Sequence, residues 1–163
     1  MIVIERINSL PIDRLSALVT EADATGFHAL SRLLTEWRSG FNRFNKPGEA
    51  LLIATDNGHV VGVCGLNRDP YLSDPMVGRV RHLYVAVDHR RRGIGSRLVR
   101  AVMGAASGHF ARLRLRTDSP DADGLYRSLG FKPFTAEPAC SHQLAFIDES
   151  QPQAGSFCDR GQH

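Results

Sequence analysis

The feature of this sequence that most constrains its fold is the stretch from Gly78 to Met103, GRVRHLYVAVDHRRRGIGSRLVRAVM. Its first part, from about Val80 to Val85, is β-branched and aromatic with a rough period of two, which predicts a strand. A helix is expected to open near Gly93, because apolar residues follow at helical spacing on one face: Ile94, Leu98, Val99, Val102 and Met103. The stretch therefore predicts a strand, a tight basic turn and a helix in direct succession.

The turn has the composition of a phosphate-binding site. Arg90, Arg91 and Arg92 lead directly into Gly93 and Gly95. A helix N-terminus leaves main-chain N–H groups unpaired and carries a partial positive charge, and glycine leaves room for phosphate oxygens. The arginines add fixed charge and forked donors. A solvated basic corner is the alternative interpretation of these arginines.

Two known phosphate motifs do not fit, because the chain has no GxxxxGK[ST] and RRRGIGS lacks the third glycine of the dinucleotide fingerprint. What remains, Arg90-x-x-Gly93-x-Gly95 after a strand ending in LYV, resembles the acetyl-CoA pyrophosphate signature R/Q-x-x-G-x-G/A of the GNAT superfamily of N-acetyltransferases. A second GNAT motif, N-x-x-A-x-x-φ-Y-x-x-L-G-F, is matched downstream by Ala122, Leu125, Tyr126, Leu129, Gly130 and Phe131. The resemblance covers roughly Glu49 to Ile147.

This resemblance implies an α/β (α+β) GNAT fold, with a mixed, mostly antiparallel sheet, splayed central strands and helices on both faces. The local patterns agree: strand-like runs cover Ile2 to Ile7 and Arg112 to Thr117, and two more, Glu49 to Asp56 and His59 to Leu66, meet at the hairpin signal Asn57-Gly58. Besides the helix near Gly93, helices are expected from Pro11 to Gly26, from Leu30 to Gly40, and after Asp121, which would cap the last of them. We expect one domain over residues 1–147 and a polar, flexible tail over residues 148–163.

Composition narrows the class of partner. The net charge is +3, but seven arginines and only one acid, Asp88, lie between Arg79 and Arg100. Few aromatic residues accompany them, so a polyphosphate such as CoA explains the cluster better than nucleic acid. No apolar run approaches the roughly 20 residues needed to span a bilayer, and the N-terminus does not resemble a signal peptide. A cytoplasmic protein with no membrane partner is therefore expected.

The resemblance also implies roles for individual residues. Acetyl-CoA would be the cosubstrate, with no metal, and its pyrophosphate would bind at residues 90–96: Arg90, Arg91, Arg92, Gly93, Ile94, Gly95 and Ser96. Main-chain groups of Leu83, Tyr84 and Val85 would bond the pantetheine arm as an added strand and polarise the acetyl carbonyl. Ser119 replaces the asparagine of the family and would make a weaker contact. Tyr126 would be the general acid, because a phenol keeps its proton at pH 7; a core tyrosine beside Leu125 is the alternative.

The sequence does not decide which residue is the general base or which residues bind the acceptor. Where many family members carry a Glu on the central strand, this chain has Arg79. A period of two places Arg79 and Arg81 on one face with Leu83 and Val85, where they would bind a carboxylate or phosphate of the substrate; the alternative is that they pair with Asp69 or Asp74. His82 is a candidate base if a bulge turns it into the pocket; it is otherwise a core histidine, and deprotonation through water is equally open. Asp69 and Asp74, beside prolines, are expected to form turns in a loop that Pro70, Pro75 and Gly78 keep irregular.

These observations lead to the hypothesis of an N-acetyltransferase that moves acetyl from acetyl-CoA to a primary amine by direct attack in a ternary complex. No cysteine lies near either motif, which argues against an acetyl-enzyme. A small-molecule amine is favoured over a protein as acceptor, and a homodimer is left open. Phe41, Phe44 and Trp37 either pack on the core or form an aromatic wall for the acceptor. The alternative function is a non-catalytic acetyl-CoA-binding, protein-binding or RNA-binding module on the same fold.

Overall fold

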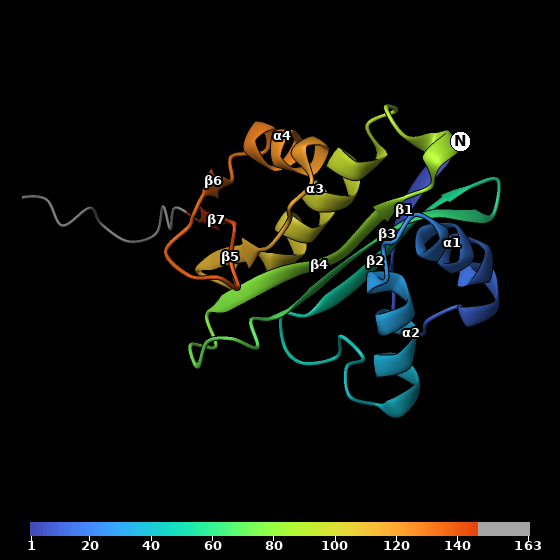
Figure 1. Cartoon of the computed structure of the whole chain (residues 1–163). Coiled ribbons are helices and arrows are strands. Elements are labelled where there is room, and N and C mark those ends of the chain that lie inside the picture. The colour runs from blue at the N-terminus through green and yellow to red at the C-terminus, as the bar shows by residue number, and fades with distance from the viewer. Residues whose placement is uncertain (147–163) are drawn as a thin grey trace, which may run out of the picture.

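The computed structural model describes residues 1–146, so the predicted tail over residues 148–163 lies outside the described residues. Seven strands form one sheet (Figure 1). In spatial order they are β1 (Ile2–Ile7), β2 (Ala50–Asp56), β3 (His59–Arg68), β4 (Val77–Val85), β5 (Arg112–Leu115), β7 (His142–Ala145) and β6 (Lys132–Pro133). Neighbouring strands are antiparallel except β4 and β5, which are parallel. This confirms the predicted mixed, mostly antiparallel sheet.

Helices cover both faces of the sheet, as predicted (Figure 1). The short η1 (Val87–His89) precedes α3 (Ile94–Ala106), which packs on one face near α4 (Pro120–Ser128); α1 (Ile12–Ala24) and α2 (Ala29–Ser39) pack on the other. Two apolar clusters result, one beneath α3 and one beneath α1 and α2. No helix among residues 1–146 has both the length and the apolar character needed to cross a membrane.

Local sequence signals explain several boundaries. Asn57 and Gly58 both have positive φ, 49° and 84°, as a type I′ hairpin turn requires, and they join β2 to β3 as predicted. Gly40, with φ 77°, ends α2 in the left-handed conformation. Ser119, not Asp121, caps α4: its hydroxyl accepts the Ala122 N–H at 3.3 Å, and Pro120 occupies the first helical turn. Proline is favoured at that position because its missing N–H has no helical partner there.

The pairing of β4 with β5 is short. It joins residues 77–79 of β4 to residues 112–114 of β5. β4 then continues to Val85, and within the described residues its positions 80–85 have no partner on β5. The two central strands therefore splay, as predicted, and leave one edge of β4 without a strand neighbour.

A bulge in β4 changes which side chains share a face. Between the pairs Gly65–Arg81 and Val63–Tyr84, β4 has one residue more than β3, and His82 has φ 61°. Arg81 consequently lies on the α2 side of the sheet with His82, and its guanidinium is 3.5 Å from the carboxylate of Glu36 in α2. The prediction that Arg81 shares a face with Leu83 and Val85 was wrong, because a strict period of two ignores the bulge.

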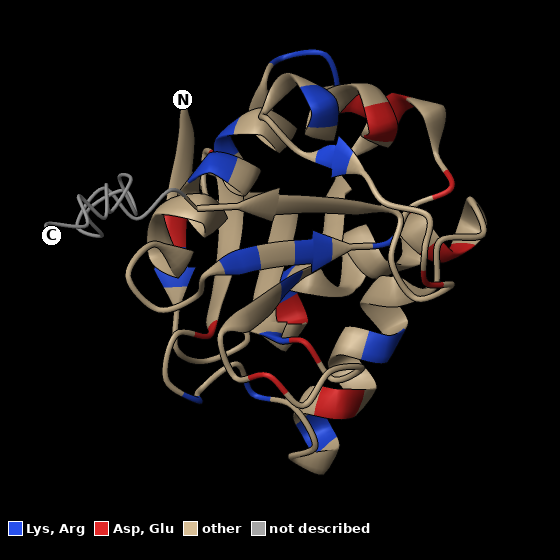
Figure 2. Cartoon of the chain, turned by 90° about the vertical axis from the view of Figure 1, so that its left-hand side faces the viewer, with Lys and Arg blue, Asp and Glu red and all other residues tan. Residues whose placement is uncertain are grey.

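At the closed end of the splay, Arg79 and Arg114 lie opposite each other in register and share one carboxylate. The Asp69 carboxylate is 3.5 Å from Arg79 Nη1 and 3.8 Å from Arg114 Nε, and all three side chains are buried. Arg79 also donates to the Ala139 carbonyl at 2.7 Å, and Arg114 pairs with Glu137. Two roles were considered for Arg79, binding of the substrate and pairing with Asp69 or Asp74; the structure shows the ion pair with Asp69. Basic and acidic segments accordingly lie close together near the middle of the sheet (Figure 2).

The loop before β4 is shorter than predicted. β4 begins at Val77, so Gly78 lies in a strand instead of interrupting one. A side chain at Gly78 would come within 3.0 Å of Phe110 and Leu113, so glycine serves here for close packing. Asp69 and Asp74 do form turns, as predicted, by accepting the main-chain N–H groups of Tyr71 and Met76.

We expect Asp69→Ala to lower the free energy of unfolding by about 3–5 kcal/mol, because it leaves two buried guanidinium groups short of a counter-charge. Asp74→Ala is the matched control: it removes a turn-forming aspartate from the same loop that is exposed, and should cost no more than about 1.5 kcal/mol. Urea denaturation of both variants measures the difference. Equal losses would show that the Asp69 ion pairs contribute nothing beyond the turn.

Candidate active site

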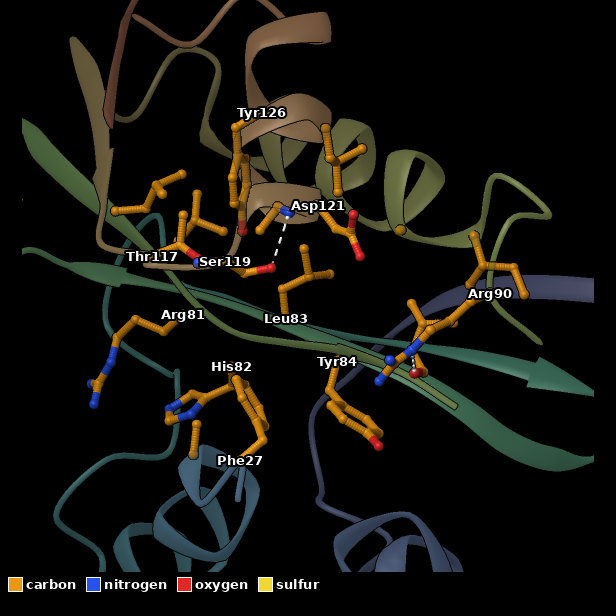
Figure 3. Close-up of a pocket in the computed structure, with 18 of the residues that line it drawn as sticks. Phe27, Arg81, His82, Leu83, Tyr84, Arg90, Thr117, Ser119, Asp121 and Tyr126 are labelled. Carbon is orange, nitrogen blue, oxygen red and sulfur yellow. Dashed lines mark hydrogen bonds between the residues drawn. The ribbon is translucent and has the colours of Figure 1, made fainter. Parts of the chain in front are cut away.

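A cavity of about 900 Å³ runs along the open edge of β4, from the start of α3 to the start of α2 (Figure 3). β4 supplies its floor, with Leu83 turned toward α4 and with His82 and Tyr84 turned to the opposite side. The residues predicted for cofactor, substrate and catalysis line it, with one exception, Arg92: Arg79, Arg81, Leu83, Tyr84, Val85, Arg90, Arg91, Gly93, Ile94, Gly95, Ser96, Ser119 and Tyr126. Arg92, within the same turn, is exposed outside this lining.

The start of α3 exposes main-chain donors to the cavity. Gly93 caps the helix with φ 76°, and the first N–H that reaches back to it belongs to Arg97, at 3.0 Å from the Gly93 carbonyl. The N–H groups of Ile94, Gly95 and Ser96 precede that bond, so they have no helical acceptor. A side chain built at Gly93 meets nothing within 4 Å, whereas one at Gly95 touches Leu125 at 3.4 Å. The turn is therefore an open row of amides with Arg91 beside it.

Arg90 and Tyr84 tie this turn to β4 and α1. Arg90 Nε donates to the Val85 carbonyl at 2.9 Å, and its guanidinium lies 5.2 Å from the centre of the Tyr84 ring (Figure 3). The Tyr84 hydroxyl donates to Glu21 at 2.6 Å, and the same carboxylate accepts the Val87 N–H at 3.2 Å. Arg90 thus shapes the turn in this structure, and its side chain already has a main-chain partner.

Tyr126 projects from α4 toward Ser119 and Leu83 at the middle of the cavity (Figure 3). Its ring packs edge-on against Phe131 with centroids 5.3 Å apart, and only 4% of its surface is exposed. Burial raises the pKa of the Tyr126 phenol well above its ordinary value, because the charged form would lose its hydration. The phenol therefore keeps its proton at neutral pH. Tyr126 packs in the core and also lines the cavity, so its position is compatible with both interpretations, a core tyrosine and a general acid.

His82 is a buried polar residue of the cavity. It is 7% exposed, and neither ring nitrogen has a hydrogen-bond partner within residues 1–146. Burial, reinforced by the nearby charge of Arg81, lowers the pKa of His82 to about 3. The imidazole is consequently neutral at physiological pH and a weak acceptor for a proton.

Comparison with known proteins identifies the fold family. A model of the acetyltransferase (GNAT) domain matches residues 47–133, more than half of the chain. The chain belongs to the GNAT acetyltransferase family. N-alpha-acetyltransferase RimI from Mycobacterium tuberculosis is 35% identical over 95 residues, which are 58% of this chain and 60% of that protein. The match therefore spans less than two thirds of that relative's length.

Solved structures agree with this GNAT assignment. The crystal structure of a protein from Exiguobacterium sp. 255-15 is similar with a TM-score of 0.79 and 27% identity, over 89% of this chain and 93% of that one. A GNAT family acetyltransferase from Brucella melitensis, solved in complex with acetyl-CoA, shares the fold with a TM-score of 0.65 and 20% identity, over 90% of this chain and 89% of that one. The recognition of the family from its two motifs is confirmed.

The residues that form one wall of the cavity were not predicted from the sequence. Thr25, Phe27, Ala29 and Arg32, from the end of α1 and the start of α2, line the cavity opposite α4. No sequence motif marks these residues. The available signal was the break at Gly26 between two amphipathic helices, since a helix start beside a loop is a common position for binding groups.

The aromatic residues considered for that wall lie elsewhere. None of Trp37, Phe41 and Phe44, all within the described residues, lines the cavity. Phe44 is buried against Gly65, where a side chain would come within 2.6 Å of its ring, and Phe41 is 82% exposed. Within residues 1–146, no group of three or more His, Cys, Asp or Glu side chains is arranged to hold a metal ion.

The buried neutral His82 should make folding sensitive to acid. In the unfolded chain its pKa returns to about 6.5, so between that pH and about 3 the unfolded state binds one proton more than the folded state. The free energy of unfolding should therefore fall by about 2 kcal/mol more between pH 7 and pH 5 in the wild type than in His82→Asn. Asparagine is chosen because it tolerates positive φ. Urea denaturation at the two pH values tests this, and equal pH dependence of the two proteins would contradict it.

Proposed function

We propose that this protein is an N-acetyltransferase that moves the acetyl group of acetyl-CoA to a primary amine by direct attack in a ternary complex. The proposal is carried by one observation: an unpaired strand edge, the open amides of the α3 N-terminus and the phenol of Tyr126 all line the same cavity. Each of the three matches one requirement of acetyl transfer from a thioester. Acetyl-CoA supplies an acetyl group already activated for attack.

The cavity residues fit acetyl-CoA from end to end. The N–H groups of Ile94, Gly95 and Ser96, with the guanidinium of Arg91, would hold the pyrophosphate. Main-chain groups of Leu83, Tyr84 and Val85 lie along the edge of β4 that lacks a partner, where an extended pantetheine arm would add as a strand. A main-chain N–H on this edge would donate to the acetyl oxygen and stabilise negative charge as it develops. Ser119 caps α4 through its oxygen, so its hydroxyl hydrogen stays free to donate.

Tyr126 supplies the acid. As the amine nitrogen bonds to the acetyl carbon and the carbon–sulfur bond breaks, the phenol gives its proton to the departing thiolate. The proton that the amine nitrogen loses returns to the Tyr126 oxygen through water, so the enzyme ends each turnover unchanged. His82 is not used as the base, because a group with a pKa of about 3 accepts such a proton poorly.

Direct attack is supported by the state of Cys64. Cys64, on β3, is fully buried, and burial raises the pKa of its thiol to about 12. A thiol that does not ionise and does not line the cavity is a poor nucleophile. The M. tuberculosis relative is an N-alpha-acetyltransferase, which supports nitrogen as the acceptor atom. We favour a small-molecule amine over a protein.

Acetyl-CoA at about 100 times its dissociation constant should raise the melting temperature of the wild type by about 5 °C or more. Gly93→Leu should abolish this shift, because the new side chain would occupy the space next to the exposed amides. Gly108→Leu is the matched control: Gly108 also has positive φ, 82° against 76°, and also faces open space, but it lies beyond the other end of α3. It should lose stability without losing the shift. If RNA stabilises the protein and acetyl-CoA does not, the function proposed is wrong.

Tyr126→Phe should lower kcat by about 100-fold or more while the shift caused by acetyl-CoA stays near that of the wild type. Only the donated proton is lost, since the ring and its packing are kept. Tyr71→Phe, at an exposed tyrosine outside the cavity, serves as the control and should keep full activity. Release of free thiol from acetyl-CoA in the presence of a panel of amines gives the rates. A rate unchanged across the pH profile would remove Tyr126 from the acid role.

A further inference from the structure

We propose that the acceptor is an amine that also carries a carboxylate, and that Arg32 of α2, with Arg81 and His82 of β4, binds this carboxylate. The inference rests on the proposed function and names its substrate class. It concerns the end of the cavity opposite the α3 N-terminus, on the α1–α2 side of the sheet. No residue needed for binding acetyl-CoA takes part in it.

The charge at this end of the cavity is positive. Arg32 and Arg81 line it, and Glu36 offsets Arg81 at 3.5 Å. Arg32 is exposed and has no acidic partner within 4.0 Å among residues 1–146, so it supplies the net charge. Arg79 also lines the cavity, but its guanidinium is buried and its donors go to Asp69 and to the Ala139 carbonyl. A free guanidinium beside a second one suits the two oxygens of a carboxylate.

His82 gives independent evidence that a polar ligand belongs here. Its ring is more than nine-tenths buried and lines the cavity. Both ring nitrogens are themselves buried and make no hydrogen bond of good geometry in the described chain, with the main chain of Ala29 close to the ring. Buried polar atoms are nearly always hydrogen-bonded, so a ring without a well-formed hydrogen bond beside a cavity favours a polar ligand at this position. Because burial and Arg81 keep the imidazole neutral, it offers one N–H donor to an anion.

The start of α2 adds main-chain donors to the same place. Ala29 lines the cavity, and the first N–H bonded back along this eleven-residue helix is that of Arg32, to the His28 carbonyl at 3.1 Å. The amides of Ala29, Leu30 and Ser31 therefore precede the helical ladder and carry its partial positive charge. Figure 3 shows the His82 ring turned toward this side of the sheet.

The cavity offers little to a second cationic group. Among the described residues, Asp121 is the only carboxylate in its lining, and it lies on α4, across the sheet from α2. A polyamine or an aminoglycoside would place further positive charges near Arg32 and Arg81. An amino acid would instead bring one amine to the thioester and one carboxylate to these arginines.

The test compares α-amino acids with their carboxamides, which keep the amine and remove the negative charge. In the wild type, kcat/KM should favour the acids by about 10- to 100-fold, the range of one charged hydrogen bond. Arg32→Ala should bring this preference near unity, mainly through KM, and leave the carboxamides unchanged. Arg38→Ala, an exposed arginine of α2 outside the cavity lining, should keep the preference. Arg32 is chosen over Arg81 because removing Arg81 would strand Glu36, whose side chain is 15% exposed.

A second readout avoids turnover. With coenzyme A in place of acetyl-CoA, calorimetric titration should show tighter binding of the acid than of its amide, and Arg32→Ala should remove the difference. If carboxamides, polyamines or amidated peptides without acidic side chains are acetylated as well as or better than the acids, the inference is overturned while the acetyltransferase stands. If acetyl-CoA binds and no amine is acetylated, the proposed function itself fails, and the inference with it.

Discussion

The site depends on one constraint, the early end of pairing between β4 and β5. At the closed end, Arg79 and Arg114 lie opposite in register and share the buried carboxylate of Asp69, and Glu137 also pairs with Arg114, so the like charges in adjacent strands are offset. Beyond that point the strands separate, and the edge of β4 keeps main-chain donors and acceptors without a strand partner. Buried backbone groups need partners, so this edge is a place for an extended ligand and not simply a void.

Much of this arrangement could be predicted from the sequence, because the signals that carry it are local. The strand, turn and helix from Val77 to Ala106 follow from a change of apolar period and from two glycines, and the β2–β3 hairpin follows from Asn57-Gly58. The GNAT motifs fixed the order of elements around them. The cap of α4 was also within reach, since Pro120 directly after Ser119 favours Ser119 over Asp121 as the cap.

The parts that could not be predicted depend on contacts between distant segments. The bulge at His82 arises from the register of β4 against β3, and it turns Arg81 to the α2 side of the sheet. The sequence of β4 alone does not contain this information. Asp69 was interpreted as a turn former, and its pairing with Arg114 appears only once β5 lies beside β4. Phe27 and Arg32 reach the cavity because α1 and α2 pack on the sheet, a tertiary effect without a motif.

Departures from local backbone rules cluster around the cavity. Among residues 1–146, four non-glycine residues have positive φ: Phe44, Asn57, His82 and Arg91. Asn57 belongs to the hairpin turn, whereas His82 and Arg91 line opposite ends of the cavity and Phe44 packs edge-on against the His82 ring at 6.1 Å. Such conformations are unfavourable for residues with a side chain and persist where surrounding structure enforces them, commonly at functional sites. Backbone strain thus marks both the turn we assign to the pyrophosphate and the wall we assign to the acceptor, independently of charge.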